Sequence, residues 1–235
     1  MIQSVRATID NRLLAALPAG DRRRIVASCD QVELESAAVL HEAGSRLRHI
    51  YFPTDAYISL VTPLNAAASL EVALVGNEGM VGLSVLLGVP VSPLNHLVQG
   101  SGAALRISVP SFQRELQNSP ALRRRLDLYV YVKLHQIAQT AACTRFHMLE
   151  ARLARWLLMT NDRSHSNEFH ATHEFLAYML GVRRVGITKA ATSLQMRLLI
   201  RYTRGKITIL DRLGLEAISC GCYLADNELY DSILG

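Results

Sequence analysis

Cysteine is scarce in this sequence, which has four cysteines in 235 residues. A chain of this length can fold around its own apolar core, and four scattered thiols do not form a convincing disulfide framework. Cys29 and Cys143 are isolated, whereas one glycine separates Cys220 from Cys222. Two interpretations of that pair stay open: small residues in a C-terminal helix or turn, or a redox or metal switch.

Long uncharged runs are also missing. Arg6, Asp10 and Arg12 interrupt the N-terminal region, so we expect no secretion signal. The only candidate for a membrane span, 79–105, contains five glycines and two prolines, and its apolar stretch 80–91 is too short to cross a bilayer. We therefore expect a cytoplasmic protein without a membrane partner.

Acidic side chains are few in the middle of the chain, where Glu71 and Glu78 are the only acids between Asp55 and Glu115. No Ser-His-Asp set and no triad of metal ligands accompanies them, so the sequence offers no candidate active site. We predict that the protein is not an enzyme.

Basic residues, in contrast, are concentrated in one segment. The chain has a net charge of +5, and residues 172–206 contain seven Lys or Arg with a single acid, Glu174. Because this local excess is larger than that of the whole chain, the remainder is close to neutral. A basic segment in a near-neutral protein is typical of a localised nucleic-acid surface.

The apolar pattern divides the N-terminal half into helices and strands. Residues 1–30 indicate two short helices, and alternation with a period of two over 31–110 predicts short strands. The uncharged segment 79–88 has room for one or two helical turns, and 111–118 predicts a short helix. We expect an α+β protein in which residues 1–118 form an antiparallel β-sandwich or β-roll.

A long helix is expected next, over 119–147. Ser119-Pro120 is a typical start, because proline is tolerated in the first turn. Apolar residues then recur every three or four positions, as in a helix that packs on another helix. Such a seam either joins two copies of the chain or packs on its own domain, and we predict a dimer helix. The expected seam residues are Leu126, Val130, Leu134, Ile137 and Ala141.

Residues 148–235 are predicted to form a winged helix-turn-helix domain. An amphipathic run is followed by a polar loop at 160–171, after which Thr172 suits the N-cap of a helix that Gly181 ends. A second helix begins at Arg183 or Arg184. We expect it to bury Ile187, Ala190, Ala191, Leu194 and Leu198, and to expose Val185, Thr188, Lys189, Thr192 and Met196.

A β-hairpin follows this helix, with β-prone runs at 199–202 and 207–210 around Arg204-Gly205. The hairpin would form the wing and place Arg204 and Lys206 near DNA phosphates. The alternative is a solvated basic face on a structural hairpin, but the compact order of the elements favours DNA binding. The candidate DNA-contacting residues are Thr172, Arg183, Arg184, Val185, Thr188, Lys189, Thr192, Arg204 and Lys206.

These elements resemble the Crp/Fnr superfamily of bacterial transcription regulators over nearly the whole chain. "FLAYMLGVRRVGITKAATSL" (175–194) and "LIRYTRGKITIL" (199–210) are similar to the family's DNA-binding signature. "YFPTDAYISL" (51–60) and "EVALVGNEGMVGL" (71–83) are similar to its sensor strands and Gly-rich cassette. The resemblance implies that residues 1–118 are a β-roll sensor domain of the cupin-like jelly-roll type, similar to cyclic-nucleotide-binding domains. It also implies a homodimer on a palindromic double-stranded DNA operator, with this sensor domain controlling the geometry of DNA binding. RNA polymerase is a further candidate partner.

For base reading, the resemblance implies an arginine, an adjacent acid, and a basic residue one turn later. Arg184 and Lys189 match the first and third positions, whereas Val185 stands in place of the acid. Valine cannot accept a hydrogen bond from cytosine but can pack on a thymine methyl group. We expect Arg184 to contact guanine, and the half-site to differ from that of the family's best-known member. Gly186 permits a close backbone approach either to DNA or to the preceding helix.

The sensor cassette departs from the family pattern. Members that bind cyclic nucleotides use a glutamate for the ribose and an arginine for the phosphate, but the matching stretch here reads Met80-Val81. No Lys or Arg occurs between Arg48 and Arg106. Because a buried phosphate without a cation carries a large desolvation cost, we expect no usual binding of cyclic AMP, and the effector stays open. The candidate pocket residues are Glu71, Gly79, Met80, Gly82, Leu83, Asn95 and His96.

Other sensing chemistries have weak support. Only Cys29 lies in the region where iron–sulfur members carry several cysteines. Single histidines are more often structural than haem ligands, and three histidines in a loop are a weak metal pattern. These two sets are His41, His49 and His96, and His165, His170 and His173. We predict no metal site, with a signal carried by Cys220 and Cys222 as the alternative to sensing in the β-roll.

Overall fold

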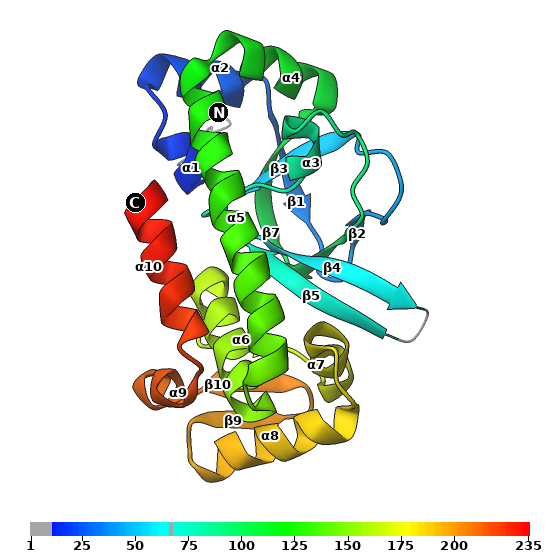
Figure 1. The fold of residues 1–235 in the computed structure, drawn as a ribbon, viewed down its shortest axis with the longest axis vertical. Coiled ribbons are helices and arrows are strands. Elements are labelled where there is room, and N and C mark those ends of the chain that lie inside the picture. Colours follow the sequence, from blue (N-terminus) through cyan, green and yellow to red (C-terminus); the bar gives the residue numbers. More distant parts are fainter. Residues whose placement is uncertain (1–10, 66–67) are drawn as a thin grey trace, which may run out of the picture.

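The computed structural model describes residues 11–65 and 68–235. They form an N-terminal lobe of strands and short helices, a long central helix, and a C-terminal lobe of helices with a small sheet (Figure 1). Arg6 and Asp10, which entered the expectation about a secretion signal, lie outside the described residues. Within the described ranges, no helix has both the length and the apolar character needed to cross a membrane.

Seven strands form the antiparallel β-roll that the alternation predicts. They are β1 (Asp30–Leu34), β2 (Val39–His41), β3 (His49–Pro53), β4 (Tyr57–Asn65), β5 (Ala68–Val75), β6 (Asn95–Gly100) and β7 (Gly102–Ser108). One sheet has the order β1-β7-β3 and the other β2-β6-β4-β5. Apolar residues of both sheets, among them Ile58, Val75 and Ala104, form a shared core.

Short helices build a second core on the outer side of the roll. They are α1 (Arg12–Ala15), α2 (Ala19–Ala27), α3 (Leu83–Leu86) and α4 (Val109–Asn118). Leu105 and Ile107 of β7 pack in this core with Phe112 of α4. α4 begins earlier than predicted, because the Ser108 hydroxyl caps it and Pro110 fits its first turn.

The long helix α5 (Pro120–Phe146) runs through the middle of the molecule (Figure 1). It begins as predicted, with Ser119 as the N-cap and proline in the first turn. The prediction for its first seam residue is wrong: Leu126 is fully buried in the second core of its own chain. The helical period located the apolar stripe correctly, but the stripe turns from the core into solvent along the helix.

The C-terminal lobe contains the predicted helix-turn-helix and wing. Its elements are α6 (Leu149–Ser164), β8 (Glu168–His170), α7 (His173–Leu180), α8 (Arg184–Met196), β9 (Ile200–Thr203), β10 (Lys206–Ile209) and α9 (Arg212–Ile218). The segment 160–171 is not a loop throughout, because α6 continues to Ser164 and β8 pairs with β10. The polar side chains of this segment predicted a loop, but Asn161 is buried and donates a hydrogen bond to the Ser166 carbonyl.

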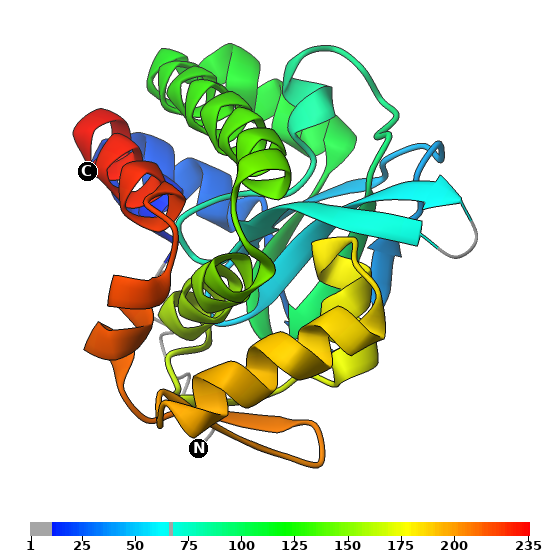
Figure 2. The same ribbon diagram turned by 60° about the horizontal axis from the view of Figure 1, so that its bottom comes forward.

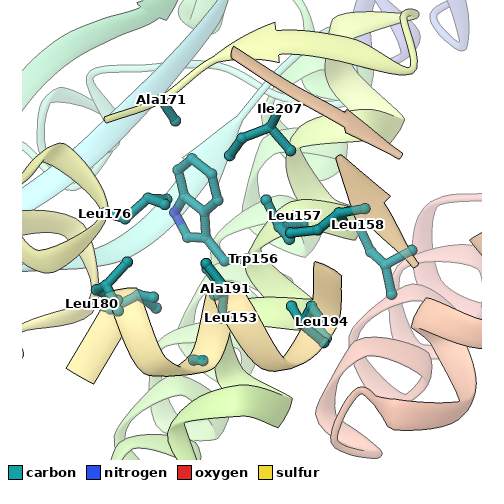
Figure 3. Close-up of a cluster of buried hydrophobic side chains, with 14 of the residues drawn as sticks. Leu153, Trp156, Leu157, Leu158, Ala171, Leu176, Leu180, Ala191, Leu194 and Ile207 are labelled. Atoms are coloured by element: carbon teal, nitrogen blue, oxygen red, sulfur yellow. The ribbon is translucent and has the colours of Figure 1, made fainter. Parts of the chain in front are cut away.

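Trp156 lies at the centre of the core of this lobe (Figure 3). Leu176 of α7, Ala191 of α8 and Ile207 of β10 belong to the same buried cluster. One aromatic side chain therefore helps to hold the two helices of the helix-turn-helix and the wing in a fixed arrangement.

The last helix, α10 (Cys222–Leu234), returns to the N-terminal lobe. It packs along α5 (Figure 1), and its Tyr230 and Leu234 join the second core. A buried ion pair connects it to α6, with Arg155 Nη2 at 2.6 Å from Asp226 Oδ2. Residues 222–234 thus connect the two lobes, although the prediction assigned them to the DNA-binding domain.

Candidate functional site

The helix-turn-helix is shaped by two local devices that the sequence predicts. The Thr172 side chain caps α7, because its Oγ1 accepts a hydrogen bond from the Phe175 amide at 3.1 Å. Gly181 follows α7 with φ of +63°, a left-handed conformation that glycine adopts at low cost. α8 then begins at Arg184, so the turn between the helices is short.

One face of α8 is buried, mostly as predicted. Ile187, Ala190, Ala191 and Leu194 are the buried residues of this helix. Leu198, which was expected among them, is 72% exposed. The helix has already ended at Met196, and Leu198 takes a left-handed conformation in the turn that leads to β9.

The predicted DNA-contacting residues all have exposed side chains. α8 and the β9–β10 hairpin lie beside each other at one end of the molecule, as the turned view shows (Figure 2). Val185 is 61% exposed, so its methyl groups are available to a partner. The exposed set is Thr172, Arg183, Arg184, Val185, Thr188, Lys189, Thr192, Arg204 and Lys206.

Contacts within this surface leave the cations largely available. Arg184 Nε lies 3.9 Å from a Glu174 oxygen, and Lys206 pairs with Glu168. Exposed ion pairs of this kind contribute little free energy, about 0–1 kcal/mol, and phosphates can replace the carboxylates. The Thr188 hydroxyl of α8 lies 3.0 Å from His173 Nδ1 of α7. This contact between the two helices orients the Thr188 side chain.

The wing ends in the turn that the Arg204-Gly205 pair predicts. Arg204 has φ of +50° and Gly205 φ of +83°, and two successive positive values are typical of a tight hairpin turn. A side chain on Gly205 would meet the His170 ring, with its Cβ at 2.7 Å from Nε2. The exposed Arg204 side chain therefore sits at the tip of a constrained hairpin.

Of the two neighbours considered from the sequence, the preceding helix α7 is not the one that Gly186 approaches. A Cβ at this position would lie 2.9 Å from Leu149 Cδ2, at the start of α6. The missing side chain thus lets α8 approach α6, which is the helix that leads from α5 into the lobe.

The helix-turn-helix is packed against the β-roll. α7 contacts β5, and the Ser69 hydroxyl donates a hydrogen bond of 2.9 Å to the Tyr178 carbonyl. Arg152 of α6 donates to the Leu180 carbonyl at 2.6 Å. The position of α8 is therefore coupled to the β4–β5 hairpin through α7.

The seven candidate pocket residues lie in three different surroundings. Glu71 lines a cavity between β5, α5, α6 and α7, whereas His96 lines a hollow beside β2 and β3. Asn95 accepts a hydrogen bond from the Ala43 amide. The segment that contains Gly79, Met80, Gly82 and Leu83 packs instead against the second core and α5.

Cations do reach the cassette, but they come from other elements. Arg163 of α6 donates two hydrogen bonds to Glu78 Oε1, at 2.7 and 3.1 Å, and Lys133 Nζ of α5 lies 4.0 Å from the same oxygen. The charges of Arg163 and Lys133 hold the pKa of Glu78 below its ordinary value despite burial. Close by, a side chain on Gly79 would collide with the Tyr129 hydroxyl, so α5 is seated directly on this loop.

The histidines considered as ligands are dispersed. His41 and His96 are neighbours, with ring centroids 4.9 Å apart, and burial lowers the pKa of His96 to about 3. His173 stacks on Tyr202, with ring centroids 4.3 Å apart, and His165 ends α6 in a left-handed conformation. The rings of His41, His96 and His173 thus each pack on another ring.

A different group of potential metal ligands is brought together by the fold. Cys143, His147, Cys220 and Cys222 have ligand atoms that all lie within 4.8 Å of one another. The sequence indicates the pair at 220 and 222 but not its proximity to the other two residues. The available signal was the spacing of Cys143 and His147, which places both on one side of a helix end.

The thiols of this group differ in acidity. The pKa of Cys143 is lowered, because its hydrogen bond with Cys220 and the neighbouring His147 and Arg155 together outweigh burial. The same hydrogen bond, together with burial, raises the pKa of Cys220. The fold thus favours a thiolate at the end of α5.

Comparison with known protein families identifies the C-terminal lobe. Residues 151–218 match the family model of the Crp-like helix-turn-helix domain. A comparison with curated proteins found no match.

Solved structures similar to this chain share its fold over most of their length. A candidate transcriptional regulator of the Crp/Fnr family from Eubacterium rectale has a TM-score of 0.70 and 18% identity, over 88% of this chain and 96% of its own. FixK2 from Bradyrhizobium japonicum has a TM-score of 0.69 and 12% identity, over 82% of this chain and 98% of its own. The c-di-GMP responsive global regulator CLP from Xanthomonas campestris has a TM-score of 0.68 and 15% identity, over 82% of this chain and 99% of its own. The chain therefore has the fold of Crp/Fnr regulators.

Proposed function

We propose that this chain, with its Crp-like helix-turn-helix domain on the fold of Crp/Fnr regulators, is a transcription regulator that binds DNA sequence-specifically. The observation that carries the proposal is the exposed basic surface formed by α8 and the β9–β10 wing. An exposed helix with an adjacent hairpin has the shape to enter a major groove while the wing contacts the flanking phosphates.

Arg184 and Val185 are the proposed base-reading residues. Both are exposed at the start of α8, where the side chains of a docked helix reach base edges. Arg184 offers a bidentate contact to guanine, and Val185 offers methyl groups to thymine. Arg183, Arg204 and Lys206 are assigned to phosphates, which add affinity without sequence information.

The protein is proposed to act as a homodimer on a palindromic operator. The second half of α5 supports this assignment, because Leu134, Ile137 and Ala141 are exposed along one stripe of the helix. Two such helices packed together would present two α8 helices to successive major grooves.

The β-roll is proposed to control the geometry of the reading head without the usual binding of cyclic AMP. The hydrogen bond from Ser69 to Tyr178 and the packing of α7 on β5 connect the roll with the helix-turn-helix. A shift in the β4–β5 hairpin would therefore move α8. RNA polymerase is proposed as a further partner on the promoter.

The test begins by selecting an operator from random double-stranded DNA with the full-length protein. Arg184→Ala should then lower affinity for the selected operator by about 1–3 kcal/mol, roughly 5–150-fold, and affect random DNA far less. Arg114→Ala is the matched control, an exposed arginine on α4 in the other lobe. Equal losses on operator and random DNA would show that Arg184 contacts only phosphate.

A further inference from the structure

The connection between the two lobes carries a cluster that the proposed function does not use. Cys143 lies in the last turn of α5, and His147 is the residue that ends this helix. Cys220 and Cys222 lie on either side of Gly221, where α9 leads into α10. Residues about 80 positions apart in sequence thus meet where α5 turns into the DNA-binding lobe.

The distances within the cluster suit a tetrahedral ion. Zinc binds thiolates at about 2.3 Å and imidazole nitrogen at about 2.0 Å, which places neighbouring ligand atoms roughly 3.5–3.8 Å apart. Cys143 Sγ lies 3.5 Å from Cys220 Sγ, and Cys222 Sγ lies 3.5 Å from His147 Nδ1. Because all four ligand atoms are within 4.8 Å, small side-chain rotations bring the remaining pairs to the same spacing.

The surroundings of the cluster fit a structural metal site. The three cysteines are buried and His147 is exposed, so an ion has a route in from solvent. The Gln139 side-chain amide donates a hydrogen bond to Cys222 Sγ at 3.1 Å, as outer partners of metal ligands commonly do. Three thiolates, one imidazole and one divalent cation carry a net charge of −1, which the guanidinium of Arg155 at Cys143 partly offsets.

We propose that Cys143, His147, Cys220 and Cys222 bind one Zn²⁺ ion and clamp the end of α5 to the start of α10. Binding leaves three thiolates and a neutral imidazole as ligands, releases to solvent the protons of those cysteines that are still thiols, and involves no change in oxidation state. Apart from the ion, α10 is held to α5 by packing and to α6 by the Arg155–Asp226 pair. The site therefore sets the angle of the DNA-binding lobe on the long helix, a consequence that rests on the proposed function.

The primary test is metal analysis of the full-length chain purified under reducing conditions. Elemental mass spectrometry should find about one zinc per chain, and Co²⁺ added to the chelated protein should give the visible absorption of tetrahedral thiolate coordination. Cys220→Ser and Cys222→Ser should each lose the zinc and the cobalt spectrum. His147→Ala should weaken zinc retention against a chelator by at least about tenfold, because even the loss of an outer partner of a metal ligand costs about 10–100-fold in affinity.

Cys29→Ser is the matched control, because Cys29 lies on the other lobe, outside the cluster, and should keep the full metal content. Circular dichroism of each variant separates loss of the ion from loss of the fold. Absence of zinc and of the cobalt spectrum in folded wild-type protein would overturn the proposal, as would zinc that persists in both cysteine variants. A Cys143–Cys220 disulfide in place of the metal would also overturn it and support a redox switch.

DNA binding separates this proposal from the proposed function. The zinc-depleted protein should bind the selected operator more weakly than the zinc-loaded protein, whereas random DNA should be affected less. Zinc binding without any operator binding would refute the regulator and leave the metal site standing. Operator binding by a wild-type protein that contains no zinc would refute the metal site and leave the proposed regulator standing.

Discussion

Glu71 is the acidic residue whose surroundings change its chemistry most clearly. It is fully buried on β5 and accepts a hydrogen bond of 2.6 Å from the Ser59 hydroxyl. Burial raises the pKa of Glu71 to about 7, and the lowering effects of Ser59, Arg163 and Arg155 do not outweigh it. The Glu71 carboxyl is therefore largely neutral near pH 6.

Glu71→Gln tests this state through the pH dependence of stability. Between pH values of about 4.5 and 7 the folded chain keeps a proton on Glu71 that the unfolded chain releases, so stability should fall as pH rises, by at most about 1.4 kcal/mol per pH unit. The glutamine variant should lack this component in urea unfolding at a series of pH values. Glu33→Gln, at an exposed position on β1, should keep it. An unchanged slope in Glu71→Gln would refute the assignment.

At the scale of elements, one apolar stripe of α5 is buried along the first half of the helix and exposed along the second half. Its first half buries Leu126 and Tyr129 in the second core, whereas Leu134 is 64% exposed and Ile137 lies beside it on the surface. α10 covers another side of the same helix. The exposed stripe in the second half of α5 is thus the surface that is available to a second copy of the chain.

Leu134→Glu should convert the proposed dimer into a monomer. A charge in the middle of an apolar helix pair must be desolvated on association, whereas in the single chain it remains in water. Sedimentation or light scattering measures the mass, and the melting temperature should change little at concentrations where the wild type is monomeric. Leu213→Glu, at an exposed leucine on α9, should stay dimeric. A dimer of unchanged affinity in Leu134→Glu would place the interface elsewhere.

At the scale of the whole molecule, the two lobes are connected through buried polar contacts. Arg163 of the C-terminal lobe neutralises Glu78 of the cassette, and Lys133 of α5 lies beside them. The cations that approach the cassette are therefore already paired. A cyclic nucleotide phosphate would have to displace a buried carboxylate, which is costly in a region of low dielectric constant.

Calorimetric titration with cyclic AMP should accordingly give no heat of binding at micromolar concentrations. The same preparation should bind its selected operator, which shows that the protein is folded and competent. A saturating isotherm with cyclic AMP would contradict the expectation and assign the phosphate to Arg163 or Lys133. Substitution of these two residues would then locate the site.

Much of the architecture follows from short stretches of sequence. Ser119-Pro120, Thr172 and Gly181 act through hydrogen bonds and backbone angles within a few residues, so the start of α5 and both ends of α7 could be predicted. The buried stripe of α8 follows from its helical period, and the turn of the wing from Arg204-Gly205. The exposure of the residues proposed to contact DNA could be predicted for the same reason.

Contacts between distant segments were decided by the tertiary structure. The helical period of α5 cannot tell that Leu126 faces its own core while Leu134 faces solvent, because the covering elements lie far along the chain. Likewise, only the return of α10 to α5 brings Cys220 and Cys222 to Cys143 and His147. Local patterns specify helices, turns and exposed faces, whereas the occupant of each face depends on how the folded chain packs.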